Sequence, residues 1–286
     1  MKYFLFFLFI FILSNCGGSS KNHNFTANII DGYISDANVS FSMLDDSLLA
    51  VKNTNNKGYV SYRNVENEVL YIKSIGGIDT YYEEVSKSMF YGIGQKAKRN
   101  IVSPLSYIVQ SYHFANPSTD YMYIANQVKQ KFGFENDILL FDPISKISNE
   151  ESSLMIQKMI TLEMTSTMIN TILSGSFEDV FYPLLYTEIQ KSNNLTFLYS
   201  DAFIATLGKK ISQKYAYLNQ GINISKLNLL KKPISYLISE IAHFKATNSK
   251  ELKQNYKSAY VLMYPIIDEI KNVENNISSD AVSSSI

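Results

Sequence analysis

The sequence has little of the chemistry that catalytic and metal sites need. Its 286 residues include one cysteine, Cys16, no tryptophan and three histidines. One thiol cannot form a disulfide within the chain, and no C-x-x-C pair is present. No two histidines have the spacing of an H-E-x-x-H zinc motif, and no G-x-S-x-G elbow or phosphate-binding glycine loop occurs. We therefore expect no catalytic residue, no metal site and no cofactor, and so no enzyme.

An excess of charge of one sign is also missing. The chain has 26 Lys and Arg residues against 26 Asp and Glu residues, for a formal net charge of +0. The pairs at 209–210 and 231–232 are too short to form the basic run that binds nucleic acid. A balanced surface also gives no long-range attraction to a phosphate backbone. We therefore expect no nucleic-acid partner.

The N-terminus, in contrast, carries a continuous apolar run. Met1 and Lys2 precede residues 3–13, none of which is charged. This arrangement is typical of the n-region and h-region of a secretory signal peptide. A transmembrane helix needs roughly 20 apolar residues, so the run is too short to cross a bilayer. We expect residues 1–15 to be a signal peptide.

The apolar run ends at residues 13–16 (LSNC), which resemble the lipobox of bacterial lipoproteins. The resemblance implies that the Cys16 thiol receives a diacylglycerol and that Cys16 becomes the first residue of the mature chain. Acylation of the new amine would add a further chain, and two or more acyl chains make membrane attachment stable. Gly17 is not the Asp that tends to hold such proteins at the inner membrane, so the outer membrane is favoured. The alternative is an unmodified Cys16 with a structural or reactive role.

Beyond Cys16 the composition changes twice. Residues 16–24 are rich in Gly, Ser, Lys and Asn without apolar periodicity, which is typical of a flexible tether. Residues 25–100 then contain short apolar and β-branched runs separated by turn residues. Such regular spacing predicts a small antiparallel β-sandwich. The expected strands are 25–30, 37–43, 48–51, 59–62 and 69–75.

Several short motifs follow one another in order along and just after this region. They are 30–39 (IDGYISDANV), 54–60 (TNNKGYV), 76–79 (GGID) and 102–106 (VSPLS). As a set they are similar to a prealbumin-like or carboxypeptidase-regulatory-like β-sandwich module of bacterial surface lipoproteins and adhesins. The resemblance implies that a helical segment follows the module. Family members often carry a calcium loop, but residues 44–48 (LDDSL) offer too few oxygen ligands for the 6 to 8 that calcium takes, and we interpret them as a solvated turn.

The chain changes to helix at Ser103 and Pro104. Ser is a favourable N-cap, and Pro fits the first helical position because the missing N–H would be unpaired there. We expect an all-α domain over residues 101–272 and a disordered, Ser-rich tail over 273–286. With the β-sandwich before it, this domain makes the predicted fold class α+β.

Two features organise the helical region. Residues 140–144 (LFDPI) again resemble the family, in which a Phe-Asp-Pro turn follows a helix end. Ser148 and Glu151 have the spacing of a capping box, so a helix is expected to begin there. An apolar stripe marks this helix at Met155, Met159, Leu162, Ile169 and Ile172. Later helices are expected at 177–191, 200–219, 233–246 and 249–272.

The remaining titratable and aromatic residues suggest no site. His23, His113 and His243 are expected to be exposed or hydrogen-bonded, not ligands. The adjacent acids at 45–46, 83–84 and 150–151 cannot point the same way, so solvated turns and a helix N-terminus are the simpler interpretation. Tyrosines cluster at 81–82, at 121 and 123, and at 215 and 217. They could stack on sugars or anchor a partner protein, but packing between strands and helices is favoured.

These patterns predict a location more firmly than an activity. We expect a lipid-anchored protein of the bacterial cell envelope, most simply a non-catalytic binding or structural module. The expected partners are the membrane, through the lipid on Cys16, and an envelope protein or glycan. The alternative is a carrier in which the Met-, Leu- and Phe-rich helices enclose an apolar ligand. A hydrolase comes third, and it would have to use residues that sequence spacing does not reveal.

Overall fold

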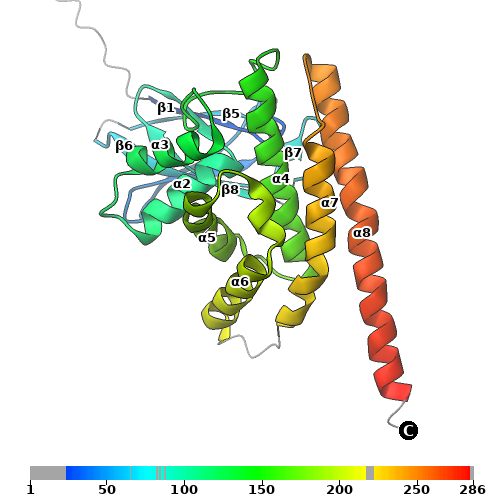
Figure 1. The fold of residues 1–286 in the computed structure, drawn as a ribbon. Helices are drawn as coiled ribbons and strands as arrows, with labels where there is room; N and C mark the ends of the chain where they lie inside the picture. Colours follow the sequence, from blue (N-terminus) through cyan, green and yellow to red (C-terminus); the bar gives the residue numbers. More distant parts are fainter. Residues whose placement is uncertain are drawn as a thin grey trace, which may run out of the picture.

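The computed structural model describes residues 24–216, except 65, 82, 84 and 87, and residues 222–283, with side chains up to residue 269. The predicted signal peptide, Cys16 and the tether up to His23 lie outside these residues. Strands make up the first part of the described chain and helices the rest, as the colours of Figure 1 show. The predicted α+β fold class is confirmed at this level.

The strands form two main sheets and one short pair. The larger sheet has the order β4-β3-β6-β8, the smaller one β5-β1-β9, and β2 pairs with β7. The predicted strands at 25–30, 37–43, 48–51, 59–62 and 69–75 correspond to β1 and β3 to β6. The bounds are β1 Asn24–Ile29, β2 Ile34–Ser35, β3 Asn38–Ser42, β4 Leu48–Asn53, β5 Tyr59–Arg63, β6 Val69–Ile75, β7 Ile78–Asp79, β8 Met89–Gln95 and β9 Arg99–Val102.

The prediction that every strand pair is antiparallel is wrong at one place. β1 and β9 run parallel, with Thr26 opposite Arg99 and Ile29 opposite Val102. Parallel neighbours need a long crossover connection, and the strands β2 to β8 supply it. The first and last strands of the β-region therefore lie side by side. β9 also extends past residue 100, where the sequence analysis ends the β-domain.

The sequence analysis did not identify β8, because Gly92 and Gly94 weaken its strand pattern. Both glycines are required by close packing. A Cβ on Gly94 would lie 2.7 Å from Ile72 Cδ1, and one on Gly92 would lie 3.0 Å from Val102 Cγ2. The missing side chains let β8 approach its neighbours closely enough to complete the sheet.

Two hydrophobic clusters lie on opposite faces of the larger sheet. One contains buried side chains of both sheets, among them Phe25 of β1, Phe41 of β3 and Ile72 of β6. The other combines Tyr71 and Ile93 of the larger sheet with side chains from the helices. Alternate residues of a strand point to opposite faces, which is why Tyr71 and Ile72 enter different clusters.

The helices cover the outer face of the larger sheet, and α4 runs through their middle (Figure 1). The apolar stripe predicted for α4 is confirmed, because its five members are buried. The helical elements are α2 Pro104–Ala115, α3 Tyr121–Phe132, α4 Glu150–Ile172, α5 Glu178–Lys191, α6 Asp201–Lys214, α7 Lys231–Ile241 and α8 Ser249–Ser283, with 3-10 segments at Leu195–Tyr199 and Ile224–Leu230.

The helix starts test two capping predictions. Ser103 caps α2 as predicted, and its backbone N–H donates to Ser106 Oγ at 2.8 Å, which completes a capping box. The capping box predicted for Ser148 and Glu151 is wrong, because Asn149 is the N-cap of α4. The Glu151 carboxylate instead accepts hydrogen bonds from the backbone of residues 135 and 136.

The last helix, α8, continues to Ser283, whereas the sequence analysis ends it at residue 272 and expects a disordered tail from 273. No Gly or Pro follows Pro265, so the sequence contains no residue that stops the helix in between. In Figure 1, α8 lies beside α7 and then continues beyond it.

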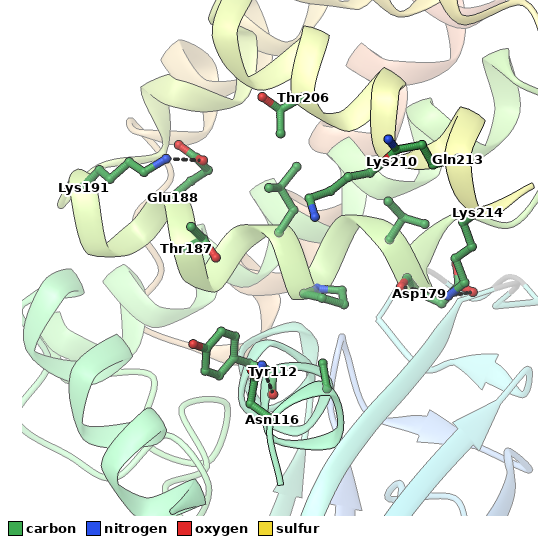
Figure 2. Close-up of a pocket in the computed structure, with 14 residues that line it drawn as sticks. Tyr112, Asn116, Asp179, Thr187, Glu188, Lys191, Thr206, Lys210, Gln213 and Lys214 are labelled. Carbon is green, nitrogen blue, oxygen red and sulfur yellow. Dashed lines mark hydrogen bonds and ion pairs between the residues drawn. The ribbon is translucent and has the colours of Figure 1, made fainter. Parts of the chain in front are cut away.

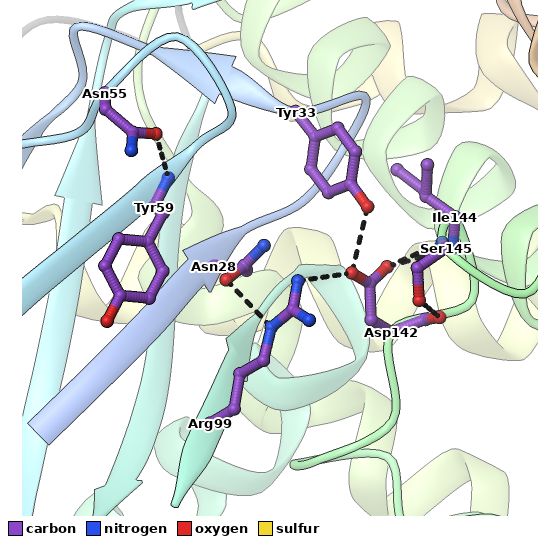
Figure 3. Close-up of polar contacts among 8 residues, drawn as sticks. All are labelled: Asn28, Tyr33, Asn55, Tyr59, Arg99, Asp142, Ile144 and Ser145. Carbon is purple, nitrogen blue, oxygen red and sulfur yellow. Dashed lines mark hydrogen bonds and ion pairs between the residues drawn. The ribbon is translucent and has the colours of Figure 1, made fainter.

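The predicted Phe-Asp-Pro turn is attached to the β-region through Asp142 (Figure 3). Asp142 Oδ2 accepts from Arg99 Nη2 at 3.0 Å and from the Tyr33 hydroxyl at 2.9 Å. Its other oxygen accepts from the backbone N–H groups of Ile144 and Ser145, both at 3.1 Å. One buried carboxylate thus shapes the turn and holds it against the sheet that contains β9.

Candidate functional site

An open cleft of about 680 Å³ lies between the end of α2, α5 and α6 (Figure 2). We name it the α5 cleft, because α5 supplies its wall over the residues from Asp179 to Lys191. The polar groups around it are hydroxyls, amides and ammonium groups. They belong to Tyr112, Asn116, Thr187, Thr206, Lys210 and Gln213, together with two ion pairs.

Of the three lysines that line the cleft, two form ion pairs. Lys191 Nζ lies 2.7 Å from Glu188 Oε1, and Lys214 Nζ lies 2.6 Å from Asp179 Oδ2. Lys210 forms no ion pair with any residue in the described part of the chain, and Figure 2 shows it extending from α6 toward α5. Its ammonium group is therefore available to an anionic group in the cleft.

A proline inside α5 adds a polar group to the same wall. Pro183 has no N–H, so the carbonyl of Asp179 loses its helical hydrogen bond. Lys214 Nζ compensates, because it donates to this carbonyl at 3.3 Å as well as pairing with the Asp179 carboxylate. This contact joins the end of α6 to the first turn of α5.

One aromatic side chain, Tyr112, lines the α5 cleft. The ring of Tyr112, near the end of α2, packs on Tyr186 of α5 with the ring centroids 3.9 Å apart. Asn116 stays close to it through a hydrogen bond from its side-chain amide to the Tyr112 carbonyl at 3.0 Å. A half-buried ring beside hydroxyl and amide groups suits a ligand that has both apolar faces and polar edges.

A second unusual feature is a group of acids buried between the β-region and the long helices. Asp31 follows β1, Asp79 ends β7 and Glu163 lies midway along α4. Each is at most 3% exposed. Carboxylates in such surroundings are costly unless they are hydrogen-bonded or protonated.

Burial governs how these acids titrate. It raises the pKa of Asp31 well above its ordinary value, and the charges of Glu163 and Asp79 raise it further. Burial also raises the pKa of Glu163 to about 7, although hydrogen bonds from Ser88, Thr167 and Tyr260 oppose the change. The protonated form of Asp31 is therefore favoured over that of an exposed aspartate, while Glu163 is close to half ionised at neutral pH.

No sequence motif predicted this group, because its members are far apart in the chain. Asp31 and Asp79 were noted only as parts of the family-like motifs 30–39 and 76–79. Glu163 carried a local signal, since it stands between Leu162 and Met164 on the predicted helix. An acid on a buried helix face is informative, because charged residues are almost never fully buried without a partner.

The residues considered as sites from sequence are placed as follows. His113 is buried, and its Nδ1 lies 2.9 Å from the Thr119 carbonyl, so it is a hydrogen-bonded histidine as predicted. His243 is exposed. Asp45 and Asp46 lie in an exposed turn, and Glu83 pairs with Lys253. His23 and Glu84 lie outside the described residues. Among the residues described, no group of three or more His, Cys, Asp or Glu is arranged to hold a metal ion.

Tyrosines line the contact between the larger sheet and the helices. The ring centroids of Tyr91 of β8 and Tyr107 of α2 are 4.8 Å apart. Tyr107 in turn stacks on Tyr182 of α5, with the ring centroids 4.0 Å apart. Of the clusters seen in the sequence, Tyr81 contacts Tyr256 of α8 at 6.1 Å. The predicted packing role is confirmed for Tyr81, whereas Tyr123 is exposed.

The methionines of α4 bear on the carrier hypothesis. Met155, Met159, Met164 and Met168 are each at most 1% exposed. A side chain that bordered an empty cavity of ligand size would leave surface accessible to water. These side chains fill the core, so the α4 stripe gives the carrier hypothesis no support.

Comparisons with known proteins do not assign the chain to a family. No protein-family model, curated protein or solved structure matches this chain. Within the described residues, no helix is both long enough and apolar enough to span a membrane.

Proposed function

We propose that the chain is a lipid-anchored protein of the bacterial cell envelope, attached to the outer membrane through Cys16. The support is the order of a positive start, an apolar run and residues 13–16 (LSNC). The predicted tether is 16–24, and its last residue, Asn24, already belongs to β1. The folded body is thus only a short tether away from the proposed anchor.

We further propose that the two main sheets form the small β-sandwich of the prealbumin-like module. The shared hydrophobic cluster supports this, since Phe25 and Val60 of the smaller sheet enter it with Phe41 and Ile72 of the larger one. Facing sheets that contribute alternate side chains to one core are the defining arrangement of a sandwich. In this proposal the module is a platform, and the helices carry the binding surface.

The proposed activity is non-catalytic binding of an acidic glycan of the cell envelope in the α5 cleft. The observation that carries it is Lys210, which extends into the cleft without an ion pair among the described residues (Figure 2). Hydroxyl and amide groups beside the Tyr112 ring suit a sugar, and the ammonium group suits its carboxylate or phosphate. An envelope protein as partner is the second possibility and is separated by the test below.

The test compares two substitutions with the same change of charge. Lys210→Glu places a carboxylate in the α5 cleft, whereas Lys209→Glu changes an exposed neighbour that does not line it. Purified full chain in neutral detergent is incubated with the acidic polysaccharide fraction of the cell envelope, and binding is measured by co-sedimentation. We expect Lys210→Glu to weaken binding about tenfold or more, because one charge-assisted contact becomes repulsive. Lys209→Glu should bind like the unmodified chain.

Equal binding by the two variants would reject the α5 cleft as the glycan site. Binding that disappears after the polysaccharide fraction is treated with protease, but survives glycan digestion, would identify a protein partner instead. Salt provides a further control, since a single ammonium contact should weaken only moderately between low and physiological ionic strength.

The anchor has its own test. Cells that express the chain are supplied with labelled palmitate, and the protein is recovered and examined for label. We expect the unmodified chain to be labelled, and Cys16→Ala to be unlabelled and to keep its signal peptide. Label that persists in Cys16→Ala would refute lipidation at this residue.

A further inference from the structure

β4, at the outer edge of the larger sheet, has no buried residue, whereas every other described strand has at least one. It pairs with β3 on one side, and no strand in the described part of the chain pairs with its other side. Backbone N–H and C=O groups along such an edge can bond to a strand from another chain. We name residues 45–53, which comprise β4 and the turn before it, the β4 edge.

The exposed side chains of β4 are largely apolar and share one face. Leu48 is 62% exposed and Val51 is 48% exposed. A register shift in the pairing of β3 with β4 places Leu48 opposite Ser42 and Val51 opposite Ser40. Ser40 and Ser42 are two residues apart on β3, so they point to the same face of the sheet, and their partners do as well. The β4 edge therefore presents two apolar side chains side by side.

Two other outer strands of the β-region are protected. In β9, the backbone N–H of Ile101 donates to the Leu139 carbonyl at 2.7 Å, so the chain before α4 covers that edge. β5, the outer strand of the smaller sheet, exposes Tyr59, Ser61 and Arg63. Cover and polar or charged side chains are the usual protection of an edge strand. β4 differs from both strands because its edge is open and its exposed residues include Leu48 and Val51.

Turns at both ends hold the β4 edge in place. Before the strand, Asp45 Oδ1 accepts from the Ser47 backbone N–H at 3.0 Å, and the Met43 N–H donates to the Ser47 carbonyl at 2.9 Å. After the strand, Asn55 Oδ1 accepts from the Tyr59 N–H at 3.1 Å (Figure 3). A strand that is already ordered costs less conformational entropy when a partner binds it.

Charges of opposite sign lie at the two ends of the β4 edge. Asp45 and Asp46 precede the strand, and Lys52 lies near its end. All three side chains are exposed, and none forms an ion pair with a described residue. When two copies of one strand pair about a two-fold axis, the start of each strand meets the end of the other. The two acids of each copy would then lie near Lys52 of the other copy.

We propose that the β4 edge pairs antiparallel with the β4 edge of a second copy of this chain, so that the two larger sheets become one. The edge is complementary to itself: its acidic end meets its basic end, and Leu48 of each copy lies near Val51 of the other on the shared face. Cross-strand apolar pairs and pairs of opposite charge both stabilise a sheet. The proposal involves neither the α5 cleft nor Cys16, so its failure would leave the proposals on glycan binding and lipidation untouched.

A disulfide reports the symmetry of the contact. Ala50 lies near the middle of β4, so two-fold pairing brings the two copies of this residue close together. Opposite residues of an antiparallel pair have Cα atoms about 4.5–5.5 Å apart, which is within disulfide range. Full chain with Ala50→Cys is mildly oxidised in neutral detergent, and the linked dimer is measured by non-reducing electrophoresis. Lys98→Cys, on the exposed turn after β8, is the matched control, and the unmodified chain reports any link through Cys16.

Exchanging the charges tests the pairing itself. Association of the full chain is measured by sedimentation in density-matched neutral detergent. Lys52→Glu should weaken the dimer about tenfold or more, because the new carboxylate meets two acids of the other copy. Asp45→Lys combined with Asp46→Lys should weaken it as well, and the variant with all three substitutions should restore it. Lys98→Glu makes the same change of charge as Lys52→Glu at an exposed site outside the β4 edge, and should leave association unchanged.

We expect the unmodified chain to dimerise and Ala50→Cys to form several-fold more linked dimer than Lys98→Cys. Circular dichroism checks that each variant is folded, and the exchange of charges decides alone if Ala50→Cys does not fold. Equal linkage of the two cysteine variants, or a triple variant that associates as weakly as Lys52→Glu, would overturn the proposal. A chain that stays monomeric at every concentration would also overturn it, and would leave the β4 edge to a strand of another protein.

Discussion

Glu163 is an ionisable side chain in the buried part of α4. Its neighbours Leu162 and Met164 are fully buried apolar residues, and Glu163 occupies the same interior at 3% exposure. One carboxylate oxygen accepts from Ser88, Thr167 and Tyr260, while the other has no hydrogen-bond partner among the described residues. Ionisation of this group is therefore unfavourable, and the cost belongs to the folded state alone.

We predict that this cost makes stability fall as pH rises. The folded-state pKa of Glu163 is about 7, above the value of an exposed glutamate, so the folded state releases its proton later than the unfolded state. The contribution of Glu163 to stability should be greatest below about pH 4.5, decrease up to about pH 7, and then level off, by up to about 3 kcal/mol in total. Asp31, whose pKa is raised in the same way, adds a loss of the same sign.

The measurement is the free energy of unfolding in urea at pH 5 and pH 8, in phosphate buffer at constant ionic strength. Glu163→Gln keeps the accepting oxygen and cannot ionise, so it should be more stable than the unmodified chain at pH 8 and show a smaller pH slope. An identical slope in the two proteins would mean that Glu163 does not titrate in this range.

At the scale of helices and strands, the sequence predicted those features that residues a few positions apart determine. Ser103 and Pro104 start α2 where predicted, because an N-cap and a first-turn proline act within a few residues. The cap of α4 was misplaced because Asn149 and Ser148 are both good caps, and a contact of Glu151 with residues 135 and 136 decides between them.

Features set by distant contacts could not be predicted in the same way. Glycine usually weakens a strand, so Gly92 and Gly94 argue against one in the sequence. In the structure, side chains of neighbouring strands occupy the space that a Cβ on either glycine would take. The α5 cleft and the group of buried acids are assembled from elements that are far apart in sequence, so no spacing between motifs predicts them. Asp142 is intermediate, since its turn was seen in the sequence and its bonds to Arg99 and Tyr33 were not.

At the scale of the whole molecule, the larger sheet contributes side chains to two hydrophobic clusters, one on each of its faces. Ile72 and Phe41 face the smaller sheet, while Tyr71 and Ile93 face the helices in the cluster that includes α4. Removing the helices would expose an apolar sheet face, and removing the strands would uncover α2. The predicted division between residues 100 and 101 falls inside β9, and packing is continuous from the strands to the helices.

We predict a single cooperative unfolding transition that involves strands and helices together. The chain has no tryptophan, so Tyr62→Trp on β5 provides a fluorescence signal confined to the β-region, and circular dichroism at 222 nm reports the helices. The two urea curves should coincide. Ile93→Ala, which removes a buried side chain at the sheet–helix contact, should shift both by the same amount, about 2–5 kcal/mol. Separate midpoints would show that the halves unfold independently.

The position of β1 has a mechanical consequence. β1 is the first described strand, it lies between β5 and β9, and it is hydrogen-bonded on both sides. With a lipid at Cys16, a pull on the body would enter through the N-terminal end of this strand and act along its length. Hydrogen bonds to both neighbours would then be loaded together in shear, not opened one after another as in a peeled edge strand. The chain therefore meets tension from its proposed anchor at a mechanically resistant point of the β-region.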